Sequence, residues 1–335
     1  MNKTERIQAA IKGNEVDSLP YGFWTHLPGL DLDPVKLADA TYEFYNKYDI
    51  DFVKTMNNGM YPVESWGCEA DFSGILNGGV AKLVSTPINC LEDWKKIQPV
   101  DIGAGSHARE LTSLGLLLKK INQEAPILFT VFSPLTIADK LSNNKVIEHI
   151  RQGGGELIHQ ALAAITQTTA KLAARAVDMG AAGVFFASQM SCYDIIPDSV
   201  YGEYGKKYDV AVLEAAGAGW FNTIHAHGNN IIFQLLRDYP VDVFNWHAWE
   251  TLPGIEEARD MTGKCLMGGL KRGDITAGNK NEISAQIYHC VKLLMKKKHI
   301  LTPGCVMRYP LDEAMLMYVK ETKDIVEKTL KENGE

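Results

Sequence analysis

The sequence predicts a single (β/α)8 barrel of the TIM type, with an insertion after the second strand. Short apolar segments, most of them β-branched or aromatic and followed by Gly, Pro, Ser or Asn, alternate with amphipathic helical segments. Strands that alternate with helices build a parallel sheet, and eight such units close a barrel. The chain has 335 residues, and α/β barrels of this length form one domain, here 1–335. A doubly wound sheet is the alternative fold.

The predicted strands are residues 20–24, 51–56, 126–133, 182–188, 221–227, 241–246, 265–270 and 299–304. Residues 33–48 carry a helical pattern that begins at Asp33-Pro34, a typical helix start. Residues 156–180 are rich in Ala and Leu, and this second helical pattern stops at Gly180. Residues 57–125 are too long for a simple crossover. We expect them to form an insertion of helices and loops that acts as a partial lid.

Composition and charge argue against several classes of protein. The net charge of −7 opposes broad contact with nucleic acid. Residues 1–15 are polar and of mixed charge, unlike a signal peptide, and no apolar run reaches the length of a membrane span. The six cysteines are scattered, without a C-x-x-C pair, so we expect no disulfide framework. The cytoplasm is therefore the expected compartment.

Two histidines and a distant cysteine form a candidate metal site. His225 and His227 are two residues apart on the fifth predicted strand and so face the same side. Cys305 follows the eighth predicted strand, and both strand ends face the mouth of a closed barrel. Two imidazoles and a thiolate suit zinc, with a fourth position open for substrate. Alternatively, the histidines are hydrogen-bonded pocket residues and the cysteine a buried thiol, and spacing alone favours that interpretation.

Other residues at strand ends are candidates for the lining of a pocket. Those we expect to contact a substrate are Trp24, Gln189, Asn245 and His247. His26 also lies at a strand end, and Trp246 lies between Asn245 and His247. For each of these residues, packing or a satisfied polar contact is the alternative.

Five segments carry a resemblance to a known superfamily along nearly the whole chain. They read "TERIQAAIKGNEVDSLPYGFW", "DFVKTMNNGMYPVESWGCE", "GAAGVFFASQ", "EARDMTGKCLMGGL" and "HILTPGCVM". In this order they resemble conserved blocks of the uroporphyrinogen decarboxylase superfamily. The resemblance implies a (β/α)8 barrel. It also implies one of two activities: decarboxylation of uroporphyrinogen without a cofactor, or zinc-dependent transfer of a methyl group between a corrinoid protein and an acceptor such as the thiol coenzyme M.

The loop after the first predicted strand separates these two branches. The decarboxylases carry an arginine-rich loop of the form R-Q-A-G-R there, which suits a substrate with many carboxylates. This chain has "FWTHLPGLDLD", with His26 in place of the first arginine and no arginine after it. The decarboxylases also usually carry histidine where this chain has Cys305. The resemblance is therefore nearer to the methyltransferase branch.

The methyltransferase pattern implies roles for named residues. That branch binds zinc through His-x-Cys on the fifth strand and the cysteine of a "PGC" motif, which correspond here to His225, His227 and Cys305. Imidazole at His227 removes a negative charge and would make the zinc a stronger Lewis acid. Glu64 aligns with an acidic position of this branch and could be a fourth ligand or a base, with a solvated loop carboxylate as the alternative. We take Glu64 and His26 as candidate catalytic residues.

The resulting hypothesis is a cytoplasmic zinc methyltransferase. Its methyl donor would be a methylcorrinoid carried by a partner protein, and its acceptor a small molecule such as a thiol or tetrahydrofolate. A tetrapyrrole decarboxylase and a non-catalytic metal- or corrinoid-binding barrel are the alternatives. We expect no nucleic-acid or membrane partner, and the sequence leaves the oligomeric state open.

Overall fold

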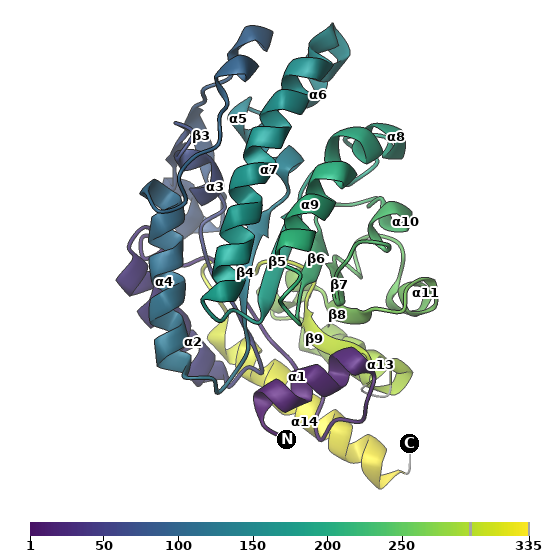
Figure 1. Cartoon of the computed structure of the whole chain (residues 1–335). Helices are drawn as coiled ribbons and strands as arrows, with labels where there is room; N and C mark the ends of the chain where they lie inside the picture. Colours follow the sequence, from purple (N-terminus) through teal and green to yellow (C-terminus); the bar gives the residue numbers. More distant parts are fainter. Residues whose placement is uncertain (295–296, 334–335) are drawn as a thin grey trace.

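A curled parallel sheet forms the centre of the molecule, and helices cover its outer side (Figure 1). The computed structural model describes residues 1–294 and 297–333. The seven-stranded sheet has the order β1-β4-β5-β6-β7-β8-β9, with every neighbouring pair parallel. The strands are β1 (Val53–Lys54), β4 (Ile127–Phe132), β5 (Gly183–Ser188), β6 (Thr223–Ala226), β7 (Val243–Trp246), β8 (Cys265–Leu270) and β9 (His299–Pro303). The α/β class and the TIM-type arrangement are confirmed.

The first predicted strand, residues 20–24, lies between the two ends of this sheet. Tyr21 forms an isolated parallel bridge with Leu301 of β9, and its carbonyl accepts a hydrogen bond from the backbone N–H of Asp51 (2.9 Å). The backbone N–H of Tyr21 donates instead to the Asp51 carboxylate (2.9 Å). Because a side chain takes this donor, the segment forms isolated bridges in place of a continuous strand.

The helices follow the predicted alternation with the strands. They are α1 (Lys3–Lys12), α2 (Pro34–Tyr48), α3 (Tyr61–Glu64), α4 (Gly105–Ile121), α5 (Pro134–Leu141), α6 (Val146–His149), α7 (Gly155–Asp178), α8 (Asp198–Tyr201), α9 (Lys207–Ala215), α10 (Phe233–Leu236), α11 (Ile255–Met261), α12 (Arg272–Thr276), α13 (Lys280–Leu294) and α14 (Glu313–Glu332), with shorter helical turns η1 (Ser73–Asn77), η2 (Leu91–Lys96), η3 (Ile150–Gly154) and η4 (Gly202–Lys206). No helix in the described part of the chain is long and apolar enough to cross a membrane.

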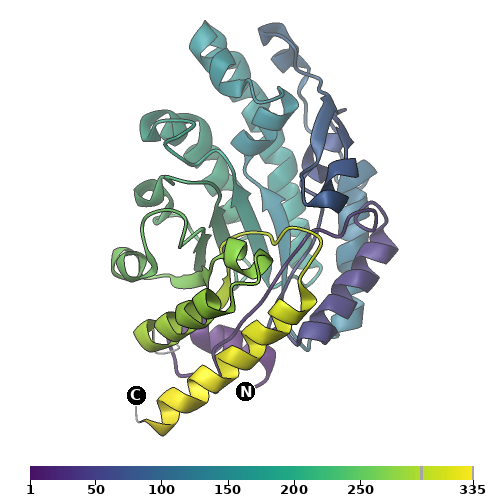
Figure 2. The ribbon, with the colours of Figure 1, turned by 180° about the vertical axis from the view of Figure 1, so that it is seen from behind.

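Local sequence explains where the predicted helices begin and how the last ones pack. The Asp33 side chain accepts hydrogen bonds from the first turn of α2, and Pro34 is the first helical residue. The second predicted helix is α7, and Gly180 follows it with a φ of 115°. Helices α13 and α14 pack against each other on the outside near β8 and β9, as Figure 2 shows.

Residues 57–125 form the predicted insertion. It contains α3, η1, η2 and α4, and also an antiparallel pair, β2 (Glu69–Asp71) and β3 (Lys82–Ser85), which the sequence pattern did not reveal. Most β2 and β3 side chains are exposed, so no alternation of buried and exposed positions marks these strands. Ile75 and Val80 of this insertion line a cavity at the barrel mouth, in agreement with a partial lid.

The core lies between the sheet and the surrounding helices. Every residue of β4 and β5 is buried. The carboxyl group of Asp209 in α9 is buried beside these residues, and its Oδ2 accepts hydrogen bonds from the hydroxyls of Tyr201 (2.6 Å) and Tyr239 (2.8 Å). Burial raises the pKa of Asp209 to about 7. This network fixes α8 and α9 behind the C-terminal end of β5, because Tyr201 also contacts the Ser188 hydroxyl (2.7 Å).

Candidate functional site

Four potential metal ligands meet at the C-terminal ends of three strands. His225 lies on β6 and His227 directly follows it, while His247 directly follows β7 and Cys305 comes two residues after β9. One ring nitrogen of each histidine and the Cys305 sulfur all lie within 4.8 Å of one another. The structure therefore brings together the three predicted ligands and adds His247, which the sequence placed among the substrate contacts.

Strand register explains this convergence. His225 pairs with Asn245 across β6 and β7, and Ala226 pairs with Trp246, so His227 and His247 are the next positions along the two strands. Gly304 brings the chain of β9 against the end of β7, where a Cβ atom on Gly304 would lie 2.7 Å from the Trp246 carbonyl oxygen. The glycine of the "PGC" motif thus permits the backbone approach that carries Cys305 into the cluster.

The cluster stabilises a thiolate. Cys305 Sγ lies 3.7 Å from His225 Nε2 and 3.5 Å from His227 Nδ1. Burial alone would raise the pKa of Cys305, but interactions with His225, His227 and His247 lower it well below its ordinary value. The thiolate is the form of cysteine that binds metals.

Asn245 orients His225 from behind. Its Oδ1 lies 2.6 Å from His225 Nδ1, while its amide nitrogen donates to the Met267 carbonyl (2.8 Å). The second bond fixes the amide so that its oxygen faces the imidazole, which leaves Nε2 of His225 free to bind a metal. Asn245 is fully buried and lies outside the described cavity lining. In this structure Asn245 therefore positions His225, and its predicted contact with a substrate stays a prediction.

Glu250 holds His247 in the same way. A Glu250 carboxylate oxygen lies 3.3 Å from His247 Nδ1. His247 Nε2 is buried and has no hydrogen-bond partner in the described structure. Burial alone would lower the pKa of His247, but Cys305 and Glu250 raise it to about 9. A buried ring nitrogen beside a thiolate is a potential ligand atom, so His247 is a candidate ligand in this structure. Its predicted contact with a substrate stays a prediction.

A cavity of about 180 Å³ opens beside the cluster. Trp24, His26 and Gln189, which the sequence placed at the mouth, are among its lining residues. Phe185 forms part of its apolar wall, with its ring 5.4 Å from that of Trp24 and 5.2 Å from that of His225. Burial lowers the pKa of His26 to about 4, so this imidazole is neutral at pH 7, and its Nδ1 has no partner in the described structure.

Two lysines in the cavity lining were not predicted from the sequence. Lys54 is the last residue of β1, and Lys140 lies in α5. Burial lowers the pKa of Lys54 to about 7 and that of Lys140 to about 8. Lys54 could have been identified from the sequence, because a charged residue is unusual within an apolar strand of a barrel. Lys140 had no such signal, because lysine is ordinary in an amphipathic helix.

Glu64 lies apart from the cluster. Its two carboxylate oxygens accept hydrogen bonds from the guanidinium of Arg109 (2.8 and 3.0 Å), and Arg109 also contacts the buried Glu110 (2.9 Å). Glu64 is neither among the clustered ligand atoms nor among the described lining residues. The structure therefore offers no support for Glu64 as a fourth ligand, because Arg109 already occupies both of its oxygens.

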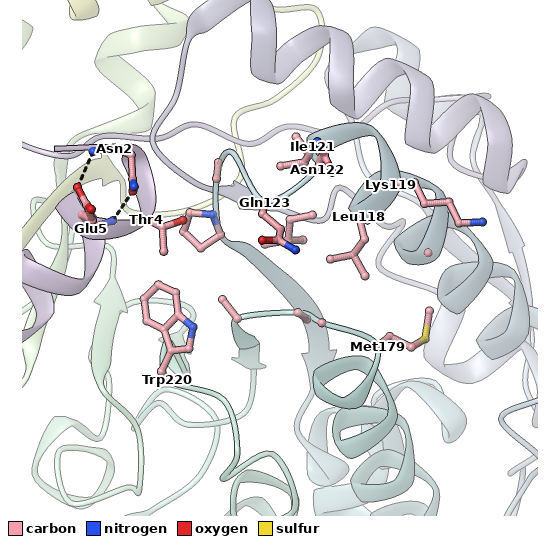
Figure 3. Close-up of a pocket in the computed structure, with 17 residues that line it drawn as sticks. Asn2, Thr4, Glu5, Leu118, Lys119, Ile121, Asn122, Gln123, Met179 and Trp220 are labelled. Atoms are coloured by element: carbon pink, nitrogen blue, oxygen red, sulfur yellow. Dashed lines mark hydrogen bonds between the residues drawn. The ribbon is translucent and has the colours of Figure 1, made fainter.

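A second hollow of about 770 Å³ lies at the opposite ends of the strands, between α1, the end of α4 and Trp220 (Figure 3). Asn2 and Glu5 in its wall hydrogen-bond to each other's backbone N–H (2.9 and 2.8 Å), drawn as dashed lines. These side chains cap α1. No histidine or cysteine is among its described lining residues, so it lacks the chemistry of the smaller cavity.

A known protein family matches nearly the whole chain. The family model described as "Uroporphyrinogen decarboxylase (URO-D)" matches residues 2–323. The chain belongs to the uroporphyrinogen decarboxylase family. This assignment confirms the resemblance seen in the sequence, while no curated protein sequence matches the chain significantly.

Solved structures show the same fold at low sequence identity. A methyltransferase from Methanosarcina mazei is 18% identical, with a TM-score of 0.82 over 97% of this chain and 99% of that one. A B12-independent methionine synthase from Shewanella sp. W3-18-1, in complex with selenomethionine, is 15% identical (TM-score 0.56; 93% and 96% covered). A putative vitamin-B12 independent methionine synthase from Listeria monocytogenes is 11% identical (TM-score 0.56; 93% and 99% covered). At these identities the likeness establishes the fold.

Proposed function

We propose that this protein is a zinc-dependent methyltransferase that moves a methyl group from a corrinoid carried by a partner protein to a small thiol. The observation that carries the proposal is the convergence of His225, His227, His247 and Cys305 beside a cavity at the barrel mouth. Membership of the uroporphyrinogen decarboxylase family and the fold shared with a methyltransferase support it. No arginine is among the described lining residues, which argues against a substrate with many carboxylates.

The donor atoms fit zinc. Typical Zn–N and Zn–S bond lengths place nitrogen and sulfur ligands of a tetrahedral site roughly 3.5 Å apart. Cys305 Sγ lies 3.5 Å from His227 Nδ1 and 3.7 Å from His225 Nε2. The unpartnered Nε2 of His247 is a further donor at the same place. The outer ring nitrogens of His225 and His247 face acceptor oxygens of Asn245 (2.6 Å) and Glu250 (3.3 Å), which is the support that histidine ligands usually have.

The residues of the site suggest a division of tasks. A bound zinc ion would supply Lewis acidity that lowers the pKa of a coordinated thiol. Trp24 and Phe185 form a wall that restricts water, and the cavity holds the acceptor beside the cluster. In the proposed transfer, the acceptor thiol would lose its proton to solvent and its sulfur would bond the methyl carbon. The electron pair of the carbon–cobalt bond would remain with the corrinoid.

Metal analysis and a spectroscopic assay test the proposal. We expect about one zinc per chain in the purified protein, because the cluster provides one set of donors. Cys305→Ala and His227→Ala should lose most of it. The matched control is Cys265→Ala, which removes a buried thiol at the start of β8 and should retain zinc.

Methyl transfer is followed by the visible spectrum of methylcobalamin, or of a methylated corrinoid protein, mixed with small thiols. Zinc-loaded wild-type protein should accelerate loss of the methyl group, and Cys305→Ala should not. Free methylcobalamin reacts more slowly than a carrier-bound donor if the partner supplies orientation. Full zinc retention in Cys305→Ala and His227→Ala, or no acceleration with either donor, would overturn the proposal.

A further inference from the structure

Lys54 places a primary amine in the lining of the cavity at the barrel mouth. It is the last residue of β1, and its side chain is buried. Lys54 pairs with Leu128 of β4, and the backbone N–H of Thr55 donates to the Leu128 carbonyl (2.9 Å). A strand of the barrel holds a side chain more precisely than a loop does, so the amine has a fixed position in the cavity.

The surroundings of Lys54 favour its neutral form. Burial lowers the pKa of Lys54 to about 7, although the charge of Cys305 opposes this shift. No aspartate or glutamate is among the described lining residues, so no carboxylate there stabilises the ammonium group. At pH 8 roughly nine in ten Lys54 side chains are therefore neutral, against roughly one in a hundred or fewer for an ordinary lysine.

The neutral amine has a lone pair available for bond formation. Lys54 Nζ donates a hydrogen bond to the Thr55 carbonyl (3.1 Å), and its nearest aromatic neighbours are Phe185 and Trp24, with ring centres 5.0 and 6.0 Å away. A neutral amine has two N–H donors and one lone pair, so the bond to Thr55 leaves the lone pair free. A desolvated lysine of this kind is a nucleophile toward carbonyl compounds.

The second lysine of the cavity suits a different task. Burial lowers the pKa of Lys140 to about 8, and the charges of Asp139 and Cys68 oppose the shift. Lys140 therefore keeps its proton at higher pH than Lys54 and is the acid available in the cavity. His26 is neutral at pH 8, since burial and the charges of both lysines lower its pKa to about 4. The other titratable groups in the described lining are His225, His227 and Cys305.

The size of the cavity limits the carbonyl compound. Its volume of about 180 Å³ is close to that of six water molecules at roughly 30 Å³ each. Pockets that enclose drug-sized ligands are larger, roughly 300–1,000 Å³. An aldehyde or ketone of a few carbon atoms fits inside, and its apolar part contacts the ring of Phe185.

We propose that Lys54 forms an imine with a small uncharged aldehyde or ketone in this cavity, an activity separate from methyl transfer. The Nζ lone pair bonds the carbonyl carbon, and the carbonyl oxygen takes up a proton. The carbon–oxygen bond then breaks, and the net result is that the oxygen leaves as water with the two N–H protons of the amine. Hydrolysis by the reverse path restores the carbonyl compound with an oxygen atom from water.

Reductive trapping tests the first half of this cycle. The purified wild-type protein is treated with propionaldehyde and cyanoborohydride, which reduces imines and leaves thiol adducts unreduced, and peptide mass spectrometry locates the propyl groups. At pH 8 we expect Lys54 to be labelled roughly tenfold or more faster than Lys171, an exposed lysine of α7. Labelling of Lys54 should be half-maximal near pH 7, whereas labelling of exposed lysines should still rise above pH 9.

Lys264 is the matched control within the same digest. Burial also lowers its pKa, and it donates to two backbone carbonyls (2.8 Å each), but it lies outside the described cavity lining. Lys264 should therefore be labelled no faster than Lys171. Faster labelling of Lys264 would show that burial alone causes the reactivity and would overturn the role of the cavity.

Oxygen exchange tests the complete cycle without a trap. Acetone is incubated with metal-free protein in water enriched in the heavy oxygen isotope, and mass spectrometry follows the isotope in the ketone. Removal of the metal excludes exchange through a metal-bound hydroxide. Wild type and Lys264→Met should accelerate the exchange, and Lys54→Met should not. If Lys54→Met fails to fold, the trapping experiment on wild type still decides the question.

The outcomes are independent of the proposed methyl transfer. A trapped imine on Lys54 supports this inference even if the protein transfers no methyl group. Equal labelling of Lys54 and Lys171 would overturn the inference even if zinc binding and methyl transfer are both found. Equal oxygen exchange in wild type and folded Lys54→Met would also overturn it.

Discussion

Replacing Asn245 should weaken metal binding although this residue donates no ligand atom. In Asn245→Ala, the Nδ1–H of His225 loses its acceptor at 2.6 Å, and the Met267 carbonyl loses its donor at 2.8 Å. Without its partner, the His225 ring is free to change its tautomer and its orientation. Both changes lower the population of the form in which Nε2 faces Cys305.

The magnitude follows from these two hydrogen bonds. Loss of a residue that supports a histidine ligand typically costs roughly tenfold to a hundredfold in metal affinity, or about 1.4–2.7 kcal/mol. Each buried polar group left without a partner costs about 1–3 kcal/mol of folding stability. We therefore expect Asn245→Ala to lower the free energy of unfolding of the metal-free protein by about 2–6 kcal/mol, less if water enters the vacated space.

Competition with a zinc-binding chromophore measures the affinity, and urea denaturation measures the stability. Asn222→Ala is the matched control. Asn222 is also buried, accepts from the backbone N–H of Val184 (3.0 Å) and donates to the Ala216 carbonyl (3.0 Å), but it lies at the opposite end of β6. It should lose stability and retain zinc affinity. Unchanged zinc affinity in Asn245→Ala would refute the assignment of His225 as a ligand held by Asn245.

Three further predictions address residues outside the cluster. Glu64→Gln should leave zinc content and methyl transfer within about twofold of wild type and lower the free energy of unfolding by about 1–2 kcal/mol, because Glu64 pairs with Arg109; a hundredfold loss of turnover would restore its catalytic role. Burial raises the pKa of Asp209 to about 7, so the folded chain holds a proton that the unfolded chain releases above about pH 4. Stability should therefore fall as pH rises from 4 to 7, and urea denaturation of Asp209→Asn should show a smaller fall; an equal fall would contradict the assignment. Uroporphyrinogen should yield no coproporphyrinogen by chromatography, because the cavity of about 180 Å³ has no arginine in its described lining; formation at the rate of a true decarboxylase would place the protein in the other branch.

The barrel was predictable because its strands alternate regularly with helices. The predicted strand 126–133 is β4 (Ile127–Phe132), and the predicted strand 265–270 is β8. The β2–β3 pair was not predictable, since its mostly exposed side chains carry no alternating pattern. The first strand was located correctly, but the interruption of its hydrogen bonds depends on the Asp51 carboxylate, a contact that local sequence cannot show.

The metal ligands were predictable where their spacing follows the two-residue period of a strand. His225 and His227 share a face and lie at a strand end, and Cys305 lies at another, so a barrel brings them together. Asn245 and His247 also share a face, but they lie at different depths in the barrel and therefore have different roles. Asn245 pairs with His225 and lies behind it, whereas His247 lies one step nearer the mouth, beside His227. Register between β6 and β7 decides these roles, and register is not visible in the sequence of either strand alone.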